Sequence, residues 1–256
     1  MSENGPLNIA VLIKHVPDMN AARVDRATGR VVTGAQMAIS SYDRYGIEAA
    51  LRLKEAFGGE ITVICAGPAA ARDGISRALA MGADRGIHLE IAQPNELDTL
   101  AIAQELASAL HGQSWDLVIA GQASDDLEDG QVGAQVAELL GMPVVSNVVK
   151  IEREGNRLLV QRDMEDGYQT VRAQLPAVVL ASTGLDEPRV ASVKGIMAAK
   201  KKPVENIAVS RNPGERLTWD EPLAPPRTVS GVIVQDVPAA NAAAQLVAWL
   251  QEQKLV

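Results

Sequence analysis

The feature that most constrains the fold is a regular alternation of short apolar runs with longer segments at helical spacing, from residue 9 to residue 181. The first run, residues 9–14, is ended by the turn signal Val16-Pro17-Asp18. Apolar runs without polar alternation are typical of strands buried on both faces. Repeated strand–helix units predict a parallel sheet with right-handed crossovers and helices on both faces. Strands are expected at residues 9–14, 60–66, 86–89, 116–120 and 177–181, and helices at residues 40–57, 70–81, 97–110 and 131–140.

A different pattern begins at residue 144. Residues 148–151, 158–162 and 169–172 alternate apolar with polar side chains, as antiparallel strands with one solvated face do. A small hairpin is expected around Ala27-Thr28-Gly29. The predicted fold is therefore α/β: a doubly wound, mostly parallel sheet with an antiparallel addition and an extended C-terminal arm.

The arm begins after Lys202, where the alternation ends. Six of the 13 prolines lie in residues 203–238, so neither a continuous helix nor a central strand is expected there. Apolar residues such as Leu217 and Trp219 continue nevertheless, which suggests an extended segment that buries its side chains on another chain. A final helix is expected at residues 239–253.

Composition narrows the possible partners. The net charge of −8 argues against nucleic acid or an anionic membrane as the main partner. A single cysteine excludes a disulfide framework, and no apolar run reaches the length of a membrane-spanning helix. The first residues lack the layout of a signal or transit peptide, so we expect a cytoplasmic location without direct membrane insertion.

The loop at residues 121–133 carries most of the expected binding chemistry. It leaves the carboxyl end of a predicted strand and enters a helix, which is where open α/β sheets bind ligands. Free N–H groups at residues 130–133 could hold a phosphate there. Four acidic residues of the same loop would repel that phosphate unless they cap the helix or hold ribose hydroxyls. From composition alone, a capping loop and a nucleotide site are equally supported.

Other short motifs point to structure rather than to catalysis. Ser40 and Asp43 fit a capping box, in which both would cover free N–H groups at the start of the helix at residues 40–57. The three histidines show no ligand spacing, so no metal site is predicted. No phosphate-binding or nucleophile motif of the common kinds is present, and we expect no catalytic residue.

The segment at residues 185–202 reads LDEPRVASVKGIMAAKKK. Polar residues mixed with apolar ones, without a clean period, predict a surface segment. Its Asp-Glu-Pro-Arg, followed closely by Gly-Ile-Met-x-Ala-Lys-Lys-Lys, resembles the signature segment of the electron transfer flavoprotein beta subunit. In that family the segment is the loop that docks onto partner dehydrogenases. The resemblance extends over nearly the whole chain.

The resemblance implies a heterodimer in which an alpha subunit holds most of an FAD. Electrons would pass from flavin-dependent dehydrogenases to a membrane quinone oxidoreductase. It also implies that a bound AMP is wrapped by the loop after Gly121, which departs from the family pattern at Ala123, where the family usually has glutamine. The cofactor contacts that the resemblance implies are Leu12, Ser40, Ser41, Tyr42, Asp43, Ala66, Gly121, Gln122, Ala123, Ser124, Asp125, Asp126, Leu127, Glu128, Asp129, Gly130, Gln131 and Val132.

Partner contacts are implied in the same way. Asp163 would help to hold the flavin domain of the alpha subunit, and Met19 would lie near the flavin. Val193 matches a leucine that anchors docking in the family, and the neighbours that would share the contact are Val190, Ile196 and Met197. The chain then divides into a nucleotide-binding α/β domain (1–184), a partner-recognition loop (185–202) and an arm and helix that pack on the partner subunit (203–256).

Two alternatives remain open from the sequence. An electron-bifurcating member of the same family would carry a second FAD in place of AMP, although the acidic, bulky stretch at residues 126–128 favours AMP. A stand-alone adenine-nucleotide regulator of the universal-stress type shares the α/β layout. It would end near Ala181 and would have a glycine-spaced phosphate loop, and the long apolar arm argues against it.

Overall fold

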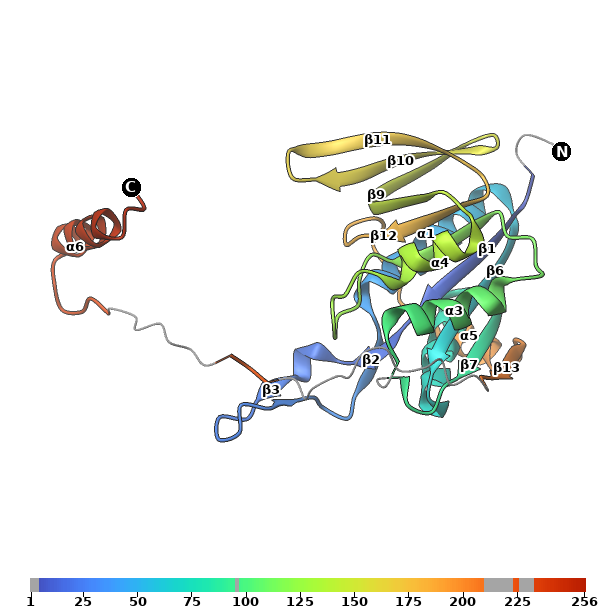
Figure 1. Cartoon of the computed structure of the whole chain (residues 1–256), viewed down its shortest axis with the longest axis horizontal. Helices are drawn as coiled ribbons and strands as arrows, with labels where there is room; N and C mark the ends of the chain where they lie inside the picture. The colour runs from blue at the N-terminus through green and yellow to red at the C-terminus, as the bar shows by residue number, and fades with distance from the viewer. Residues whose placement is uncertain (1–4, 95–96, 210–222, 226–232) are drawn as a thin grey trace.

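The structure is a computed structural model that describes residues 5–94, 97–209, 223–225 and 233–256. Its centre is a nine-stranded sheet in which β9 pairs parallel with β12 and antiparallel with β10 (Figure 1). The pairings from β9 through to β13 are parallel, and β10 and β11 extend one edge in antiparallel fashion. In spatial order the strands are β11 (Gly167–Gln174), β10 (Arg157–Met164), β9 (Val144–Glu154), β12 (Ala177–Ala181), β8 (Leu117–Gly121), β1 (Leu7–Ile13), β6 (Gly59–Gly67), β7 (Arg85–Glu90) and β13 (Val204–Ala208).

Helices cover both faces of this sheet, as the alternation in sequence predicted. Ile9 and Val11 of β1 pack in one apolar cluster with α1 (Ser41–Phe57) and α2 (Arg72–Met81). Ala10 and Leu12 point the other way, into a second cluster with α3 (Thr99–Leu110) and α4 (Val132–Leu140). Because successive side chains of a strand alternate between faces, an unbroken apolar run is what a doubly covered strand requires. The predicted α/β fold class is confirmed.

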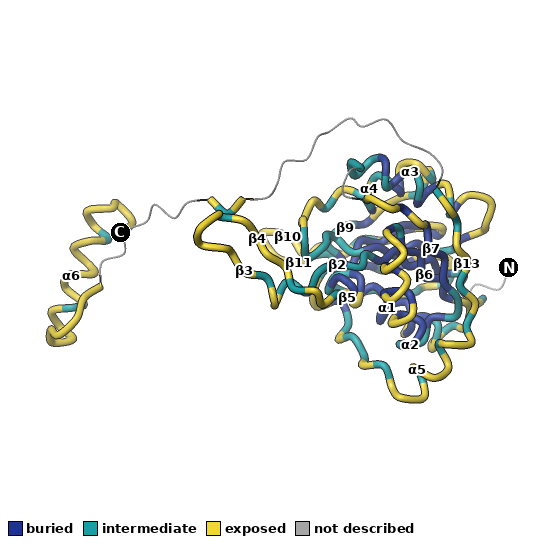
Figure 2. Tube along the Cα trace, turned by 90° about the horizontal axis from the view of Figure 1, so that it is seen from below, coloured by how far each residue is buried: buried dark blue, intermediate teal, exposed yellow. Residues whose placement is uncertain are grey.

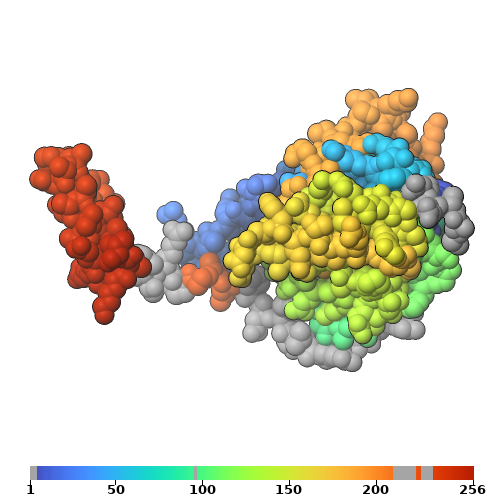
Figure 3. All heavy atoms as spheres, turned by 90° about the horizontal axis from the view of Figure 1, so that it is seen from above, coloured from blue at the N-terminus to red at the C-terminus, as the bar shows by residue number. Residues whose placement is uncertain are grey.

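The antiparallel strands cover one broad side of the body (Figure 3). Smaller elements lie beyond the carboxyl end of β1 and include the predicted hairpin, in which Val24 pairs with Val31. These elements are β2 (His15–Pro17), η1 (Met19–Ala21), β3 (Arg23–Val24), β4 (Val31–Val32) and β5 (Met37–Ile39). A single turn of 3-10 helix, η2 (Ala69–Ala71), leads into α2.

Two elements differ from the sequence expectation. The second half of the recognition segment, expected as a loop, is a short helix, α5 (Val193–Ala199), because the Ser192 hydroxyl accepts a hydrogen bond from the Gly195 N–H at 3.0 Å. Directly after the proline at 203, β13 pairs with β7 and forms the edge of the sheet, so the regular sheet continues past Lys202. An edge strand tolerates this proline-rich neighbourhood, because only one side of it must form a ladder.

The C-terminal helix α6 (Ala239–Glu252) confirms the predicted final helix. It stands clear of the body and buries none of its residues (Figures 1, 2 and 3). Leu223 is bridged to Arg30 beside the small hairpin, and the Ala224 N–H donates to the Gly29 carbonyl oxygen at 2.8 Å, so the arm contacts the domain here as well as through β13. Of the arm's apolar residues, Leu217, Trp219, Val229 and Val232 lie outside the described residues, and packing of the arm on a second subunit stays a prediction. In the part of the chain that the structure describes, no helix is long and apolar enough to cross a membrane.

Candidate functional site

The order of the strands makes the carboxyl ends of β1 and β8 a topological switch point. From β1 the chain proceeds to β6 and β7 on one side, and α3 then returns it to β8 on the other side. Such a switch point is where doubly wound sheets bind ligands. Lys14 follows β1, and its Nζ reaches Asp126 Oδ1 at 2.8 Å and Ser124 Oγ at 3.3 Å in the loop that follows β8. The predicted loop therefore lies at this switch point, joined to β1 by an ion pair.

The Asp43 carboxylate joins the carboxyl ends of β1 and β8. Its Oδ2 accepts a hydrogen bond from the Lys14 N–H at 2.6 Å, and its Oδ1 accepts one from the Gly121 N–H at 3.0 Å. The carboxyl group is buried, and burial raises its pKa to about 7 despite those two donors. Residue 121 must be glycine here, since a Cβ would lie 2.5 Å from Asp43 Oδ1.

The predicted capping box is therefore wrong. Asp43 caps strand ends rather than its own helix, and the Ser40 side chain makes no capping hydrogen bond to α1. The cap comes from the distant loop instead: Asp125 Oδ2 accepts from the Ser41 N–H at 2.7 Å, and Asp125 Oδ1 accepts from the Ser41 hydroxyl. Ser40 Oγ in turn accepts from the Asp125 N–H at 3.3 Å. A contact between residues 84 positions apart leaves no local pattern in the sequence.

Two of the four loop acids are thus paired within the protein, Asp125 with Ser41 and Asp126 with Lys14. Glu128 and Asp129 are exposed to solvent. These pairings reduce the repulsion that the loop carboxylates would exert on a phosphate where the loop meets the sheet. Glu128 and Gly130 both adopt left-handed backbone, with φ of 53° and 65°, and turn the chain into α4.

The start of α4 has free donors. Gln131, at its N-cap, makes no capping hydrogen bond from its side chain. Among the described residues, the first-turn N–H groups of α4 therefore have no side-chain acceptor, which is the arrangement that binds phosphate with help from the helix dipole. The Gln131 side chain instead accepts a hydrogen bond from the Thr99 hydroxyl at 2.8 Å.

Two contributors to this site were not predicted from the sequence. Thr99, at the start of α3, donates to Gln131 and accepts from Gln135 Nε2 at 3.2 Å, which joins the starts of α3 and α4. Asn147, at φ 55°, donates its N–H to Gln122 Oε1 at 2.8 Å, so the Gln122 side chain is turned toward β9. For Thr99 the sequence offers one signal: its hydroxyl comes directly after Asp98, the residue that caps α3.

The apolar residues implied for the nucleotide lie together on the α3–α4 face. Leu12 is buried there, and Ala66 and Val132 pack against the same cluster while remaining half-buried. Tyr42 is half-buried beside the loop, and burial raises its pKa, with Glu128 adding to the shift. Leu127, by contrast, is 52% exposed.

Asp163 lies apart, at the end of β10. It is exposed and lines an open hollow of about 800 Å³ with Asn147, Arg162, Tyr168 and Ser182 among its walls. Met19 lies in η1 and is half-buried. No contact of the described residues links Asp163 to the recognition segment.

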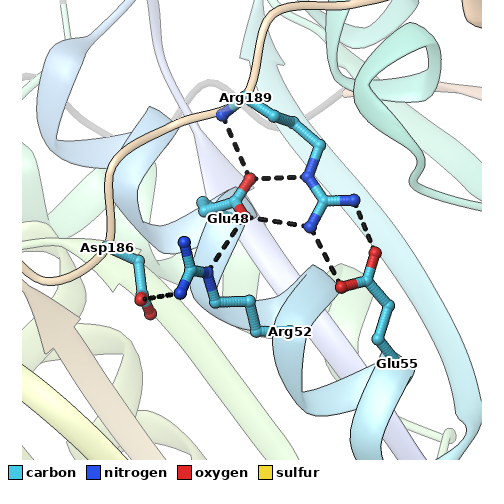
Figure 4. A network of polar contacts seen from close by, with 5 residues as sticks. All are labelled: Glu48, Arg52, Glu55, Asp186 and Arg189. Carbon is cyan, nitrogen blue, oxygen red and sulfur yellow. Dashed lines mark hydrogen bonds and ion pairs between the residues drawn. The ribbon is translucent and has the colours of Figure 1, made fainter.

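The recognition segment leaves the carboxyl side of β12 and is held against α1 (Figure 4). The apolar side chains proposed for docking all face solvent, as the sequence predicted. Their exposures are 88% for Val190, 79% for Val193, 49% for Ile196 and 59% for Met197.

Comparison with known proteins agrees with this arrangement. The family model described as "Electron transfer flavoprotein domain" matches residues 28–212. The chain is similar to the electron transfer flavoprotein subunit beta of Bacillus subtilis, with 34% identity across 98% of this chain and 100% of the relative. It is 40% identical to the subunit beta of Thermoanaerobacterium thermosaccharolyticum over 77% of this chain and 76% of the relative. It is 35% identical to the subunit beta of Homo sapiens over 90% of this chain and 93% of the relative. The chain therefore belongs to the electron transfer flavoprotein family and is one of its beta subunits, an electron-carrier component rather than a catalyst.

Proposed function

We propose that this chain pairs with an alpha subunit that holds most of an FAD, and that together they carry electrons from flavin-dependent dehydrogenases to a membrane quinone oxidoreductase. We further propose that the switch point between β1 and β8 holds a structural AMP. The observation that carries the AMP assignment is the uncapped start of α4 at the switch point of the sheet, with Asp125 and Asp126 already paired inside the protein.

The residues present fit an adenine nucleotide. The first-turn N–H groups of α4 would hold the phosphate, and Gly130 lets the backbone approach it closely. Leu12 and Ala66 offer an apolar wall to the adenosine, with Val132 above them. AMP has no redox chemistry, so its contribution is to stabilise the fold by binding only the native state.

The redox chemistry belongs to FAD, which takes up and releases electrons when bound. This chain's residues would contribute one wall of its environment and the surfaces that bring partners within reach. Asp163, exposed beside the hollow at the end of β10, would face the flavin domain of the alpha subunit. The apolar, unburied helix α6 supports an arm that packs on that subunit.

The recognition segment is proposed to dock onto dehydrogenases. Its four apolar side chains are exposed together on one surface segment, and a few such residues commonly supply most of the energy of an interface. Val193 stands where the family has the leucine that anchors docking.

The test is to co-express the chain with its alpha subunit, purify the complex and extract the bound nucleotides. One FAD and one AMP per heterodimer would support the proposal. Two FAD molecules would overturn the AMP assignment and indicate the bifurcating variant. ATP bound to an isolated monomer would overturn both.

A further inference from the structure

Arg189 fastens the start of the recognition segment to α1. Its guanidinium group lies between two carboxylates of that helix (Figure 4). Nε and Nη2 donate to the two oxygens of Glu48 at 2.8 and 2.9 Å, and Nη1 and Nη2 donate to the two oxygens of Glu55. The Arg189 backbone N–H also donates to Glu48 Oε2 at 3.1 Å. Paired, fork-shaped contacts of this kind fix orientation as well as position.

Glu48 is the centre of this network. Only 3% of its side chain is exposed, against 57% for Glu55 and 35% for Arg189. It also accepts from Arg52 Nε at 3.1 Å, and Arg52 reaches Asp186 at 3.0 Å, so one carboxylate holds both sides of Pro188. Burial alone would raise the pKa of Glu48, but the hydrogen bonds from Arg189 and Arg52 bring it below its usual value.

The far end of the segment is fastened to α2. Lys202 Nζ donates to the carbonyl oxygens of Leu79 at 2.9 Å and Ala83 at 2.6 Å, where α2 ends. Between the two ends, Gly195 of α5 lies so close to α2 that a Cβ would be 2.4 Å from the Ala80 carbonyl oxygen. The exposed apolar side chains thus sit on a short stretch that is tied at both ends and supported in the middle.

We propose that Glu48 is a positioning residue for partner recognition: through Arg189 it holds residues 190–199 in the single conformation that docks onto a dehydrogenase. The inference rests on the proposed docking function of this segment. A segment that is already ordered before binding gives higher affinity, because binding then loses less conformational entropy. When a binding-competent conformation falls to a tenth of the population, the apparent dissociation constant rises about tenfold.

The test uses the purified alpha–beta complex and the variant Glu48→Gln, which keeps the shape but removes the charge that Arg189 needs. Hydrogen–deuterium exchange should become faster in residues 190–199. Electron transfer from a purified flavin-dependent dehydrogenase should need roughly tenfold more carrier for half-saturation, with an unchanged maximal rate. Bound FAD and AMP, and reduction by a nonspecific chemical reductant, should not change.

Further variants compare Glu48 with a more exposed carboxylate of the same network and with a carboxylate outside it. Glu55→Gln should have a smaller effect, because Glu55 is largely exposed and exposed ion pairs contribute little. Glu152→Gln breaks an exposed ion pair with Lys150 on β9 and should change neither exchange nor docking. Should Glu48→Gln fail to fold, Arg189→Lys removes the forked contact from the less buried partner instead and should give the same two changes.

The outcomes separate this inference from the docking function itself. If Val193→Ala weakens docking and Glu48→Gln does not, the positioning role is refuted and the docking role stands. If neither variant affects docking, the proposed docking function has failed and the positioning role fails with it. Slower maximal transfer with both the dehydrogenase and the chemical reductant would place the defect at the flavin and would also overturn the proposal.

Discussion

At the scale of single residues, Asp43 and Gly130 shape the site proposed for the nucleotide. Asp43 joins the ends of β1 and β8 through two backbone N–H groups, and it is buried while doing so. Gly130 supplies a left-handed turn into α4. Their roles lead to two predictions.

The first concerns pH. The pKa of Asp43 is about 7 in the folded chain, above its ordinary value of 3.8. Between those values the folded chain holds a proton that the unfolded chain has released, so the free energy of unfolding falls as pH rises, by at most about 1.4 kcal/mol per pH unit. Melting temperatures measured from about pH 5 to about pH 8 should fall more steeply in the wild type than in Asp43→Asn, which cannot titrate. Parallel curves would show that Asp43 stays charged throughout.

The second concerns Gly130→Val. A β-branched residue at φ 65° is strained by about 2 kcal/mol and crowds the phosphate position. We expect a lower melting temperature together with a loss of bound AMP. Gly141→Val is the matched control: its φ is 63°, a Cβ there meets nothing within 4 Å, and it lies at the other end of α4. That variant should lose stability but keep its nucleotide. Full nucleotide occupancy in Gly130→Val would mean that the loop is wrongly assigned.

The sequence predicts a loop between β8 and α4 but not the contacts within it. The glycines of the loop and the helix that follows it are local signals, and the switch point follows from the order of the strands. The Asp125–Ser41 cap and the Thr99–Gln131 contact join residues 84 and 32 positions apart. Only the fold brings such pairs together, and for that reason the local capping box at Ser40 was read wrongly.

At the scale of elements, α5 and β13 show where a local pattern is insufficient. Buried strands such as β1 and β12 were predicted because apolar side chains on both faces leave an unmistakable run. A helix of seven residues has too few positions to show a period, and α5 persists because Gly195 packs against α2. The strand β13 carries Glu205 and Asn206, so only its pairing with β7 defines it.

The third prediction belongs to α5. Val193→Ala removes exposed methyl groups that would be buried on docking, which should weaken binding to the dehydrogenase by about 1 kcal/mol. Carrier concentration at half-maximal electron transfer should rise, while FAD and AMP contents stay the same. Val144→Ala, at an exposed valine that begins β9, provides the comparison. An unchanged half-saturating concentration in the α5 variant would leave the segment a simple crossover between β12 and β13.

At the scale of the whole molecule, the chain is a compact sheet domain with an outlying helix. The domain buries its apolar residues in two clusters, whereas α6 leaves Leu246, Val247 and Trp249 substantially exposed. An apolar helix without a partner is typical of a surface that another protein covers.

The fourth prediction tests that arrangement. A chain that ends at Val209 keeps β13 and should remain folded, yet it should no longer co-elute with the alpha subunit. A chain that ends at Lys202 also loses β13, which exposes the edge of β7, and should melt at a lower temperature than the chain ending at Val209. If either truncated chain still binds the alpha subunit with micromolar affinity, about −8 kcal/mol, the arm is not the anchor.

The helix α1 contacts both the loop that follows β8 and the recognition segment. Its first residue, Ser41, is held by the nucleotide loop through Asp125, and about 10 Å further along its axis Glu48 holds the recognition segment through Arg189. Both positions belong to a single helix packed on the sheet. Thermodynamic linkage then imposes a symmetry: whatever factor an occupied nucleotide site adds to dehydrogenase affinity, a docked dehydrogenase must add to nucleotide affinity. Where that factor exceeds one, a carrier docked on its electron donor would hold the proposed AMP more tightly during the encounter than a free carrier does.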